Sequence, residues 1–75
     1  MPKLPRVSGA ELIGALERLG FLQVRQRGSH VVLKRTGPDR VAGCVVALHS
    51  ELEIGTLRGI LKQAGVRVEE LISQM

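Results

Sequence analysis

The sequence predicts an α+β fold in the order αβββα: a three-stranded antiparallel sheet, helices on one of its faces, and a short C-terminal helix. Two observations predict it. Apolar residues recur every three or four positions in both outer parts of the chain, and β-branched runs separated by short turns fill the middle. Strands joined by short turns run antiparallel, and flanking helices usually cover one sheet face. The 75 residues are expected to form one domain over residues 1–75.

The first helix is expected over about residues 9–19. Ser8 and Glu11 have the S-x-x-E spacing of a capping box, which satisfies free backbone N–H groups at the start of a helix. Gly20 can end the helix as a C-terminal cap. Residues 1–7 hold two of the three prolines and are expected to form a loose arm. Leucines at helical spacing mark the apolar side of this helix: Leu12, Leu16 and Leu19.

Three strands are expected over residues 21–27, 29–35 and 41–48, because these runs have apolar and β-branched content. Gly28 can turn the chain between the first two strands. The composition of residues 36–40, Thr-Gly-Pro-Asp-Arg, predicts the second turn. The three strands should therefore lie side by side as a meander.

A second helix is expected after His49, where the apolar repeat changes to three and four residues. Thr56 can cap its start and Gly65 can end it. A last short helix is expected over about residues 68–74. The apolar repeat of the second helix consists of Ile54, Leu57, Ile60, Leu61 and Ala64.

Strand alternation divides the side chains of the second strand between two faces of the sheet. Val31 and Leu33 form the better core face. His30 and Lys34 are therefore expected on the open face, away from the helices. Two basic residues of the first strand also share one face, which we expect to be the open one: Arg25 and Arg27.

The chain has two histidines, His30 and His49. Histidine suits RNA cleavage without a metal, because an ordinary pKa near neutrality lets its ring remove the 2′-hydroxyl proton or protonate the leaving 5′ oxygen. The second turn is expected to join Arg35 to Val41. That register places His30 opposite Val46, on the other face from His49 and roughly 10 Å from it along the strand. We therefore expect a one-histidine site at His30, with His49 in a supporting role.

Basic residues are concentrated in the middle of the chain. The net charge is +4, and residues 18–40 hold six basic residues and one acidic residue. Such a cluster favours a polyanion partner. Phe21 is the only aromatic residue, so bases cannot stack on a row of rings, and recognition of RNA should depend on phosphates, shape and 2′-hydroxyls. The expected RNA contacts are Arg25, Arg27, Ser29, Lys34 and Arg35, with Gly28 supporting them at the turn.

Cys44 is the only cysteine and stands in an apolar run, which predicts a core position rather than a nucleophile. A lone cysteine forms no intramolecular disulfide, which fits a reducing cytosol. No apolar stretch approaches the roughly 20 residues of a membrane span. The histidines and the cysteine also lack the spacings of metal ligands. We expect a cytoplasmic protein that needs no metal and no cofactor and has no membrane partner.

Four stretches of the chain match the pattern of a known family. They are Leu19-Gly20-Phe21, the run R-Q-R-G-S-H over residues 25–30, His49, and the run G-T-L-R-G-I-L-K-Q-A-G over residues 55–65. With these stretches the sequence resembles the HicA (YcfA-like) toxins, mRNA-cleaving ribonucleases of toxin–antitoxin systems. The resemblance runs from about Ser8 to Leu71. The chain departs from it at Ala47, where the family usually has proline.

The resemblance implies a fold like that of a double-stranded-RNA-binding domain. It further implies a metal-independent endoribonuclease that cleaves mRNA with the histidine at His30. The resemblance also implies that this protein takes part in a stress response. A cognate HicB-like antitoxin is implied as the partner that covers this site and inhibits the toxin. An acidic partner would neutralise a basic open face, which agrees with this expectation.

Two other functions remain open at this point. In one, the same basic face binds duplex RNA without cleaving it. In the other, residues 57–64 and 68–74 form the helix-turn-helix of a small DNA-binding regulator. The basic and acidic residues of these two segments balance, which disfavours the second alternative because a recognition helix should be basic.

Overall fold

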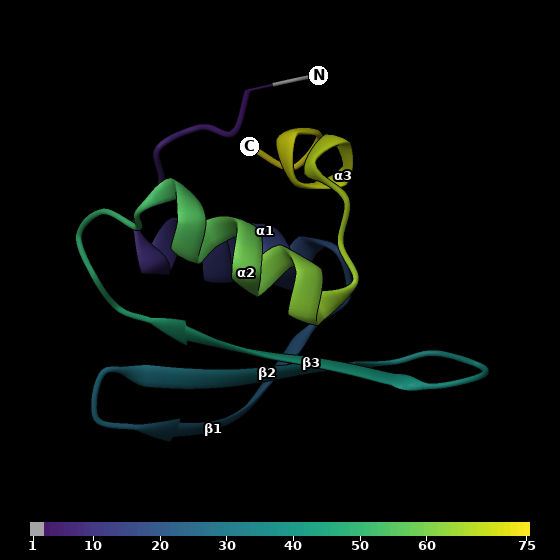
Figure 1. The fold of residues 1–75 in the computed structure, drawn as a ribbon. Coiled ribbons are helices and arrows are strands. Elements are labelled where there is room, and N and C mark those ends of the chain that lie inside the picture. Colours follow the sequence, from purple (N-terminus) through teal and green to yellow (C-terminus); the bar gives the residue numbers. More distant parts are fainter. Residues whose placement is uncertain (1–2) are drawn as a thin grey trace.

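The computed structural model describes residues 3–75. Its elements are α1 (Gly9–Arg18), β1 (Leu22–Arg27), β2 (His30–Thr36), β3 (Val41–Ala47), α2 (Ile54–Ala64) and α3 (Val68–Ile72). The strands form one antiparallel sheet in the order β1-β2-β3. All helices lie on one side of the sheet and leave its other side open (Figure 1). The predicted α+β fold is therefore confirmed. Within residues 3–75, no helix combines the length and the apolar character needed to cross a membrane.

The predicted capping box opens α1. The Glu11 N–H donates to Ser8 Oγ at 3.0 Å, and the Ser8 N–H donates to Glu11 Oε1 at 2.9 Å. The helix ends at Arg18, just before the predicted stop at Gly20. Its buried side faces the sheet and consists of Gly9, Leu12, Ile13, Ala15 and Leu16.

The start of α2 differs from the prediction. Glu53 occupies the N-cap position without a side-chain hydrogen bond, so the expected cap at Thr56 is wrong, and Thr56 lies inside the first turn. Tertiary packing explains the earlier start: Leu52 is buried, and its N–H donates to the Val7 carbonyl at 2.8 Å, which fixes the chain just before the helix. The predicted end at Gly65 is confirmed.

The last helix, α3, ends at Ile72 rather than near residue 74. The Ser73 hydroxyl donates to the Glu70 carbonyl at 2.6 Å. The carbonyl of Gln74 accepts two hydrogen bonds from the Arg18 guanidinium, at 2.8 and 3.2 Å. These contacts stop α3 and attach the last residues of the chain to the end of α1.

One hydrophobic core lies between the helices and the sheet. Val31 and Leu33 of β2 are 1% and 0% exposed, which confirms the predicted core face of the central strand. Phe21 is buried beside them. Every residue of β1 is exposed. The other buried residues come from α1, β3, α2, α3 and the connecting segments: Val7, Leu12, Ile13, Ala15, Leu16, Cys44, Val46, Leu52, Leu57, Ile60, Leu61, Ala64, Val66 and Leu71.

The predicted register between β2 and β3 is wrong by one residue. His30 lies opposite Ala47 rather than opposite Val46. The turn is tighter than its composition indicated, because the Gly37 N–H donates to the Arg40 carbonyl at 2.8 Å and leaves only two residues at the tip. The strands therefore continue further into the turn than residues 36–40 suggested.

The segment before α1 was expected to be a loose arm over residues 1–7. Residues 1–2 lie outside the described part of the chain. In the remainder, Val7 is buried and Leu4 packs against the core. Arg6 Nη1 pairs with Glu51 Oε2 at 3.1 Å. Residues 4–7 are thus held against the loop that precedes α2.

We expect Gly9→Ala to destabilise the protein. Gly9 opens α1 where the helix meets the end of β3: its N–H donates to the His49 carbonyl at 2.9 Å, and a Cβ there would collide with the Ala47 carbonyl. Forcing the helix away should lower the free energy of unfolding by about 1–3 kcal/mol. Urea unfolding followed by circular dichroism measures this change.

Gly14→Ala is the matched control in the same helix. A Cβ at Gly14 would meet only the far end of the Arg18 side chain, at 3.6 Å. The better helix propensity of alanine should raise stability by about 0.5–1 kcal/mol. A loss of stability in both variants would contradict the specific role of the Gly9 contact.

Candidate nucleic-acid interface

A two-residue turn positions His30 at the start of β2. Arg27 and His30 form the last cross-strand pair of the β1–β2 hairpin, so only Gly28 and Ser29 connect the strands. Gly28 has a φ of +59°, the left-handed value required at the first position of a type II′ turn. The Gln26 side chain donates to the Gly28 carbonyl at 3.0 Å. The turn therefore places the His30 and Arg27 side chains next to each other on one face.

A β-bulge in β1 brings a second arginine to the same face. The register shifts between Gln23 and Arg25, which leaves Val24 without a partner. After the bulge, Arg25 pairs with Val32. Paired residues of antiparallel strands point to the same side, so Arg25 lies on the open face. Arg25 thus lies on the face predicted from the sequence, and the bulge is a feature that the sequence does not predict.

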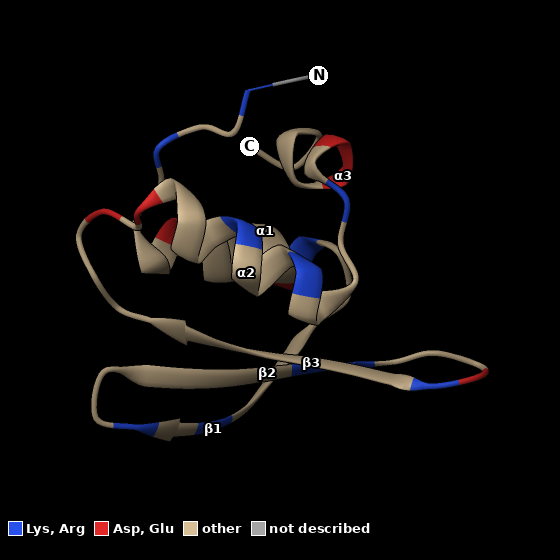
Figure 2. Cartoon of the chain, viewed as in Figure 1, with Lys and Arg blue, Asp and Glu red and all other residues tan. Residues whose placement is uncertain are grey.

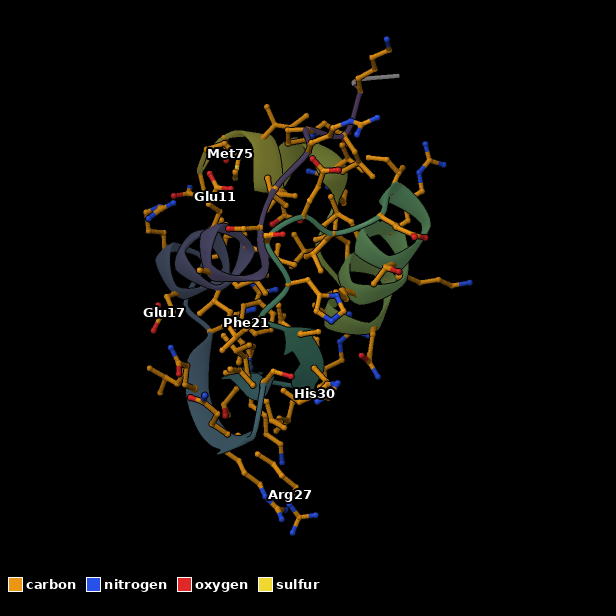
Figure 3. All side chains as sticks on the ribbon, turned by 90° about the vertical axis from the view of Figure 1, so that its left-hand side faces the viewer. Glu11, Glu17, Phe21, Arg27, His30 and Met75 are labelled. Atoms are coloured by element: carbon orange, nitrogen blue, oxygen red, sulfur yellow. The ribbon has the colours of Figure 1, made fainter. Side chains whose placement is uncertain are left out.

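Lys34 completes a set of exposed basic side chains. It pairs with Leu22 on one side and Gly43 on the other, four residues after His30 on the same face of β2. Four residues span roughly 13 Å of strand. Figure 2 shows basic residues along β1 and β2, and Figure 3 shows Arg27 and His30 on the side of the molecule away from the helices. We call this set, Arg25, Arg27, His30 and Lys34, the basic face.

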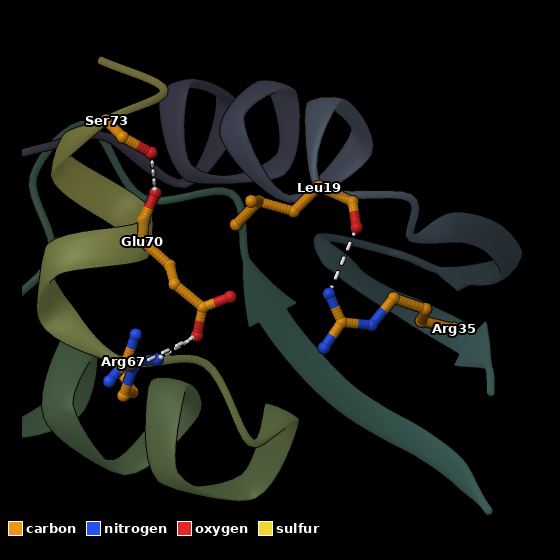
Figure 4. A network of polar contacts seen from close by, with 5 residues as sticks. All are labelled: Leu19, Arg35, Arg67, Glu70 and Ser73. Carbon is orange, nitrogen blue, oxygen red and sulfur yellow. Dashed lines mark hydrogen bonds and ion pairs between the residues drawn. The ribbon is translucent and has the colours of Figure 1, made fainter. Parts of the chain in front are cut away.

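Arg35 does not join the basic face, although it was expected to contact RNA. Its Nη1 donates to the Leu19 carbonyl at 3.1 Å (Figure 4). The guanidinium also lies 4.8 Å from the centre of the Phe21 ring, which is a cation–π contact. Neighbours on a strand point to opposite faces, so Lys34 and Arg35 could not both reach the open face. The structure gives Arg35 a role in joining β2 to the end of α1.

Ser29 and His49 lie at the same end of the sheet as His30. Ser29 is exposed in the turn, and its carbonyl accepts a hydrogen bond from the Leu48 N–H at 2.7 Å. His49 is exposed after the end of β3, and its backbone carbonyl accepts a hydrogen bond from the Gly9 N–H at 2.9 Å. Within residues 3–75, neither imidazole makes a hydrogen bond.

The corrected register changes the relation between the two histidines. His49 lies two positions beyond Ala47, the partner of His30. Two positions correspond to about 7 Å along a strand and to the same side of it. The expectation that the histidines lie on opposite faces rested on the register that proved wrong. Since β3 ends at Ala47, the chain at His49 is no longer a strand.

Cys44 has a structural role in the core. It is buried, and burial raises the pKa of its thiol from the usual 9.0 to about 11, so the thiol stays protonated and is not a nucleophile.

Two other kinds of site find no support in the structure. Among the described residues, no three His, Cys, Asp or Glu side chains lie close enough together to bind a metal ion. α3 has five residues and carries Glu69 and Glu70, so it lacks the length and charge of a DNA-recognition helix.

Comparison with known proteins gives one family. A family model described as the HicA toxin of bacterial toxin–antitoxin matches residues 9–66. The matched range begins with α1, ends just after α2 and includes the whole basic face. No curated protein matches the chain.

The raised pKa of Cys44 predicts a loss of stability in alkaline solution. Between pH 9 and pH 11 the unfolded chain releases the thiol proton while the folded chain retains it, so the free energy of unfolding should fall as the pH rises. The full fall is about 3 kcal/mol, at 1.36 kcal/mol per pKa unit. Below pH 9 this contribution is fully present.

Urea unfolding of the protein and of Cys44→Ala across this range provides the measurement. The difference in unfolding free energy between the two should shrink as the pH rises, because the alanine variant has no thiol to ionise. Parallel curves for the two proteins would show that the thiol is not protected by burial.

Proposed function

Since the chain belongs to the HicA toxin family and is therefore the toxin of a toxin–antitoxin system, we propose that it is an endoribonuclease that cleaves mRNA with His30 and without a metal. The observation that carries the proposal is the pairing of an exposed histidine with Arg27 across a two-residue turn. The family, whose members are generally ribonuclease toxins, supports the same activity.

The proposed reaction begins at the imidazole of His30, which takes the proton of a ribose 2′-hydroxyl. The 2′ oxygen attacks the adjacent phosphorus, and the bond from phosphorus to the 5′ oxygen breaks. The imidazolium can return its proton to the departing 5′ oxygen, so that one ring acts first as base and then as acid. The guanidinium of Arg27, the cross-strand partner of His30, would stabilise the negative charge that grows on the phosphoryl oxygens.

The same face suits the binding of an RNA backbone. Arg25 lies opposite Val32 on β1, and Lys34 lies two residues beyond Val32 on β2, so cationic side chains extend along the sheet from His30. Phe21, the only Phe, Tyr or Trp residue, is buried and offers no stacking surface to a base. We propose that phosphates and 2′-hydroxyls, rather than base identities, supply most of the binding energy, with Ser29 at the turn as a polar contact.

The partner of this toxin is an antitoxin, as its family implies. We propose that the antitoxin is HicB-like and covers the basic face with carboxylates, which would block His30 and neutralise the arginines together. A toxin that cleaves mRNA would act in the cytoplasm.

We expect His30→Ala to lower the rate of RNA cleavage by roughly 10²–10⁴-fold, the usual contribution of an acid–base residue. The side chain is exposed and makes no hydrogen bond within the described residues, so unfolding by urea should be unchanged. Cleavage of a labelled mRNA by purified protein in EDTA is the measurement. Retention of RNA without cleavage by the unaltered protein would instead identify a non-catalytic RNA-binding module.

His49→Ala tests whether one histidine or two carry out the reaction. A one-histidine site predicts a loss much smaller than that of His30→Ala in the same assay. An equal loss in both variants, each still folded, would assign the missing acid or base to His49 and replace the single-ring mechanism.

Arg27→Ala should weaken RNA binding, whereas Arg35→Ala should weaken the fold. Loss of Arg27, on the basic face, should reduce the slope of log affinity against log salt for RNA by about 0.7–0.9. Loss of Arg35 should leave that slope unchanged and lower the free energy of unfolding by about 1–2 kcal/mol, because the Leu19 and Phe21 contacts disappear. Filter binding at several salt concentrations, together with urea unfolding, separates the two. A reduced slope for Arg35→Ala would place this residue at the RNA.

A further inference from the structure

The two outer strands of the sheet have edges of different character. At the β1 edge, the bulge at Val24 and the charges of Arg25 and Arg27 hinder pairing with another strand. The β3 edge has none of these features, because residues 41–47 include no charged residue and no proline. Val41 and Val45 are 57% and 42% exposed. Long, uncharged, β-branched edges of this kind readily accept a further strand.

The register of the β2–β3 hairpin identifies the free backbone groups of this edge. The Leu48 N–H donates to the Ser29 carbonyl, and the Gly37 N–H donates to the Arg40 carbonyl. Bonded and non-bonded pairs alternate along antiparallel strands, so even-numbered residues of β3 bond to β2. Val41, Gly43 and Val45 direct their N–H and C=O groups away from β2. The carbonyl of the next outward residue, Ala47, is instead closely approached by Gly9 at the start of α1. The open part of the edge is therefore residues 41–45.

A hollow of about 160 Å³ runs beside the open edge. It lies between the first half of β3 and the C-terminal end of α2. The charged residues that line it are Arg40 and Lys62, and Gln63 adds a neutral polar group. A neighbouring hollow continues around the turn, where Asp39 is the single carboxylate of the lining beside Arg35 and Arg40. A strand added at this edge would place alternate side chains in a space of positive charge.

We infer that residues 41–45 bind an extended, acidic segment of a partner protein, which joins the sheet as a fourth strand beside β3. Its backbone would pair with Val41, Gly43 and Val45, and its carboxylates would contact Arg40 and Lys62. The inference rests on the proposed function only in that a toxin–antitoxin pair supplies a protein partner. It concerns a surface other than the basic face, so the partner could hold the toxin here while another part of it covers His30.

Charge favours this occupant over a second copy of the chain. Two copies paired through β3 would bring together chains that each carry a net charge of +4. They would also add a second Arg40 and a second Lys62 to the same edge. An acidic segment removes this repulsion and gains two ionic contacts, while the backbone hydrogen bonds are the same in both cases.

Amide hydrogen exchange of the isotope-labelled full-length protein, followed by NMR, tests the inference. The probe is a blocked peptide of alternating Glu and Val at millimolar concentration, with a peptide of alternating Lys and Val as control. Exchange at Val41, Gly43 and Val45 should slow by at least about ten-fold with the Glu peptide and remain unchanged with the Lys peptide. This experiment does not measure ribonuclease activity, so its result is valid whether or not His30 cleaves RNA.

Val45→Pro provides the matched variant. Proline removes the outward N–H of this edge residue and no hydrogen bond to β2, so the sheet should tolerate it. Protection of Val41 and Gly43 by the Glu peptide should disappear in Val45→Pro and persist in Val45→Thr, which keeps the N–H. If Val45→Pro does not fold, Val41→Pro, at the first residue of the strand, makes the same test.

Several results would overturn the inference. Equal protection by both peptides would show that charge does not select the segment. Protection that grows with protein concentration and needs no peptide would make a second copy the occupant. The edge of β3 does not bind such a segment if the Glu peptide slows amide exchange at no residue. The same conclusion follows if it slows exchange only at Arg25, Arg27 and His30.

Discussion

Burial of Val31 and Leu33 beneath the helices is the constraint on which the rest of the molecule depends. These two side chains of the central strand are almost completely removed from water, and strand geometry then requires His30, Val32 and Lys34 to point the other way. A register slip of β2 by one residue would expose the core residues and bury a histidine and a lysine. The free energy that holds the core together therefore also holds the basic face in place.

Much of the fold could be read from the sequence because several signals agreed. The capping box at Ser8, the alternation along β2 and the glycine after α2 each specify local structure through nearby residues. The same alternation predicted His30 and Lys34 on the open face. Arg35 could have been excluded from that face by its position next to Lys34, since neighbouring residues of a strand diverge.

The features that sequence reasoning missed depend on contacts between distant segments. Thr56 has the chemistry of a cap, but the hydrogen bond of Leu52 to Val7 starts α2 three residues earlier than a cap at Thr56 would allow. The bulge at Val24 depends on how β1 fits beside β2, and the conformational preferences of single residues do not predict it. The register of His30 depended on how many residues form the second turn, and composition does not determine that number.

The core draws on both ends of the chain, and this affects how the protein is made. Val7 and Leu71 belong to the same cluster, and the Arg18 guanidinium holds the carbonyl of Gln74. On the ribosome, the strands that carry His30 emerge well before α2 and α3, which must cover their inner side. A nascent chain without those helices exposes Val31 and Leu33 and cannot hold the sheet in its final form. Packing of α2 and α3 against the sheet is thus what fixes the strand that carries His30 in its folded position.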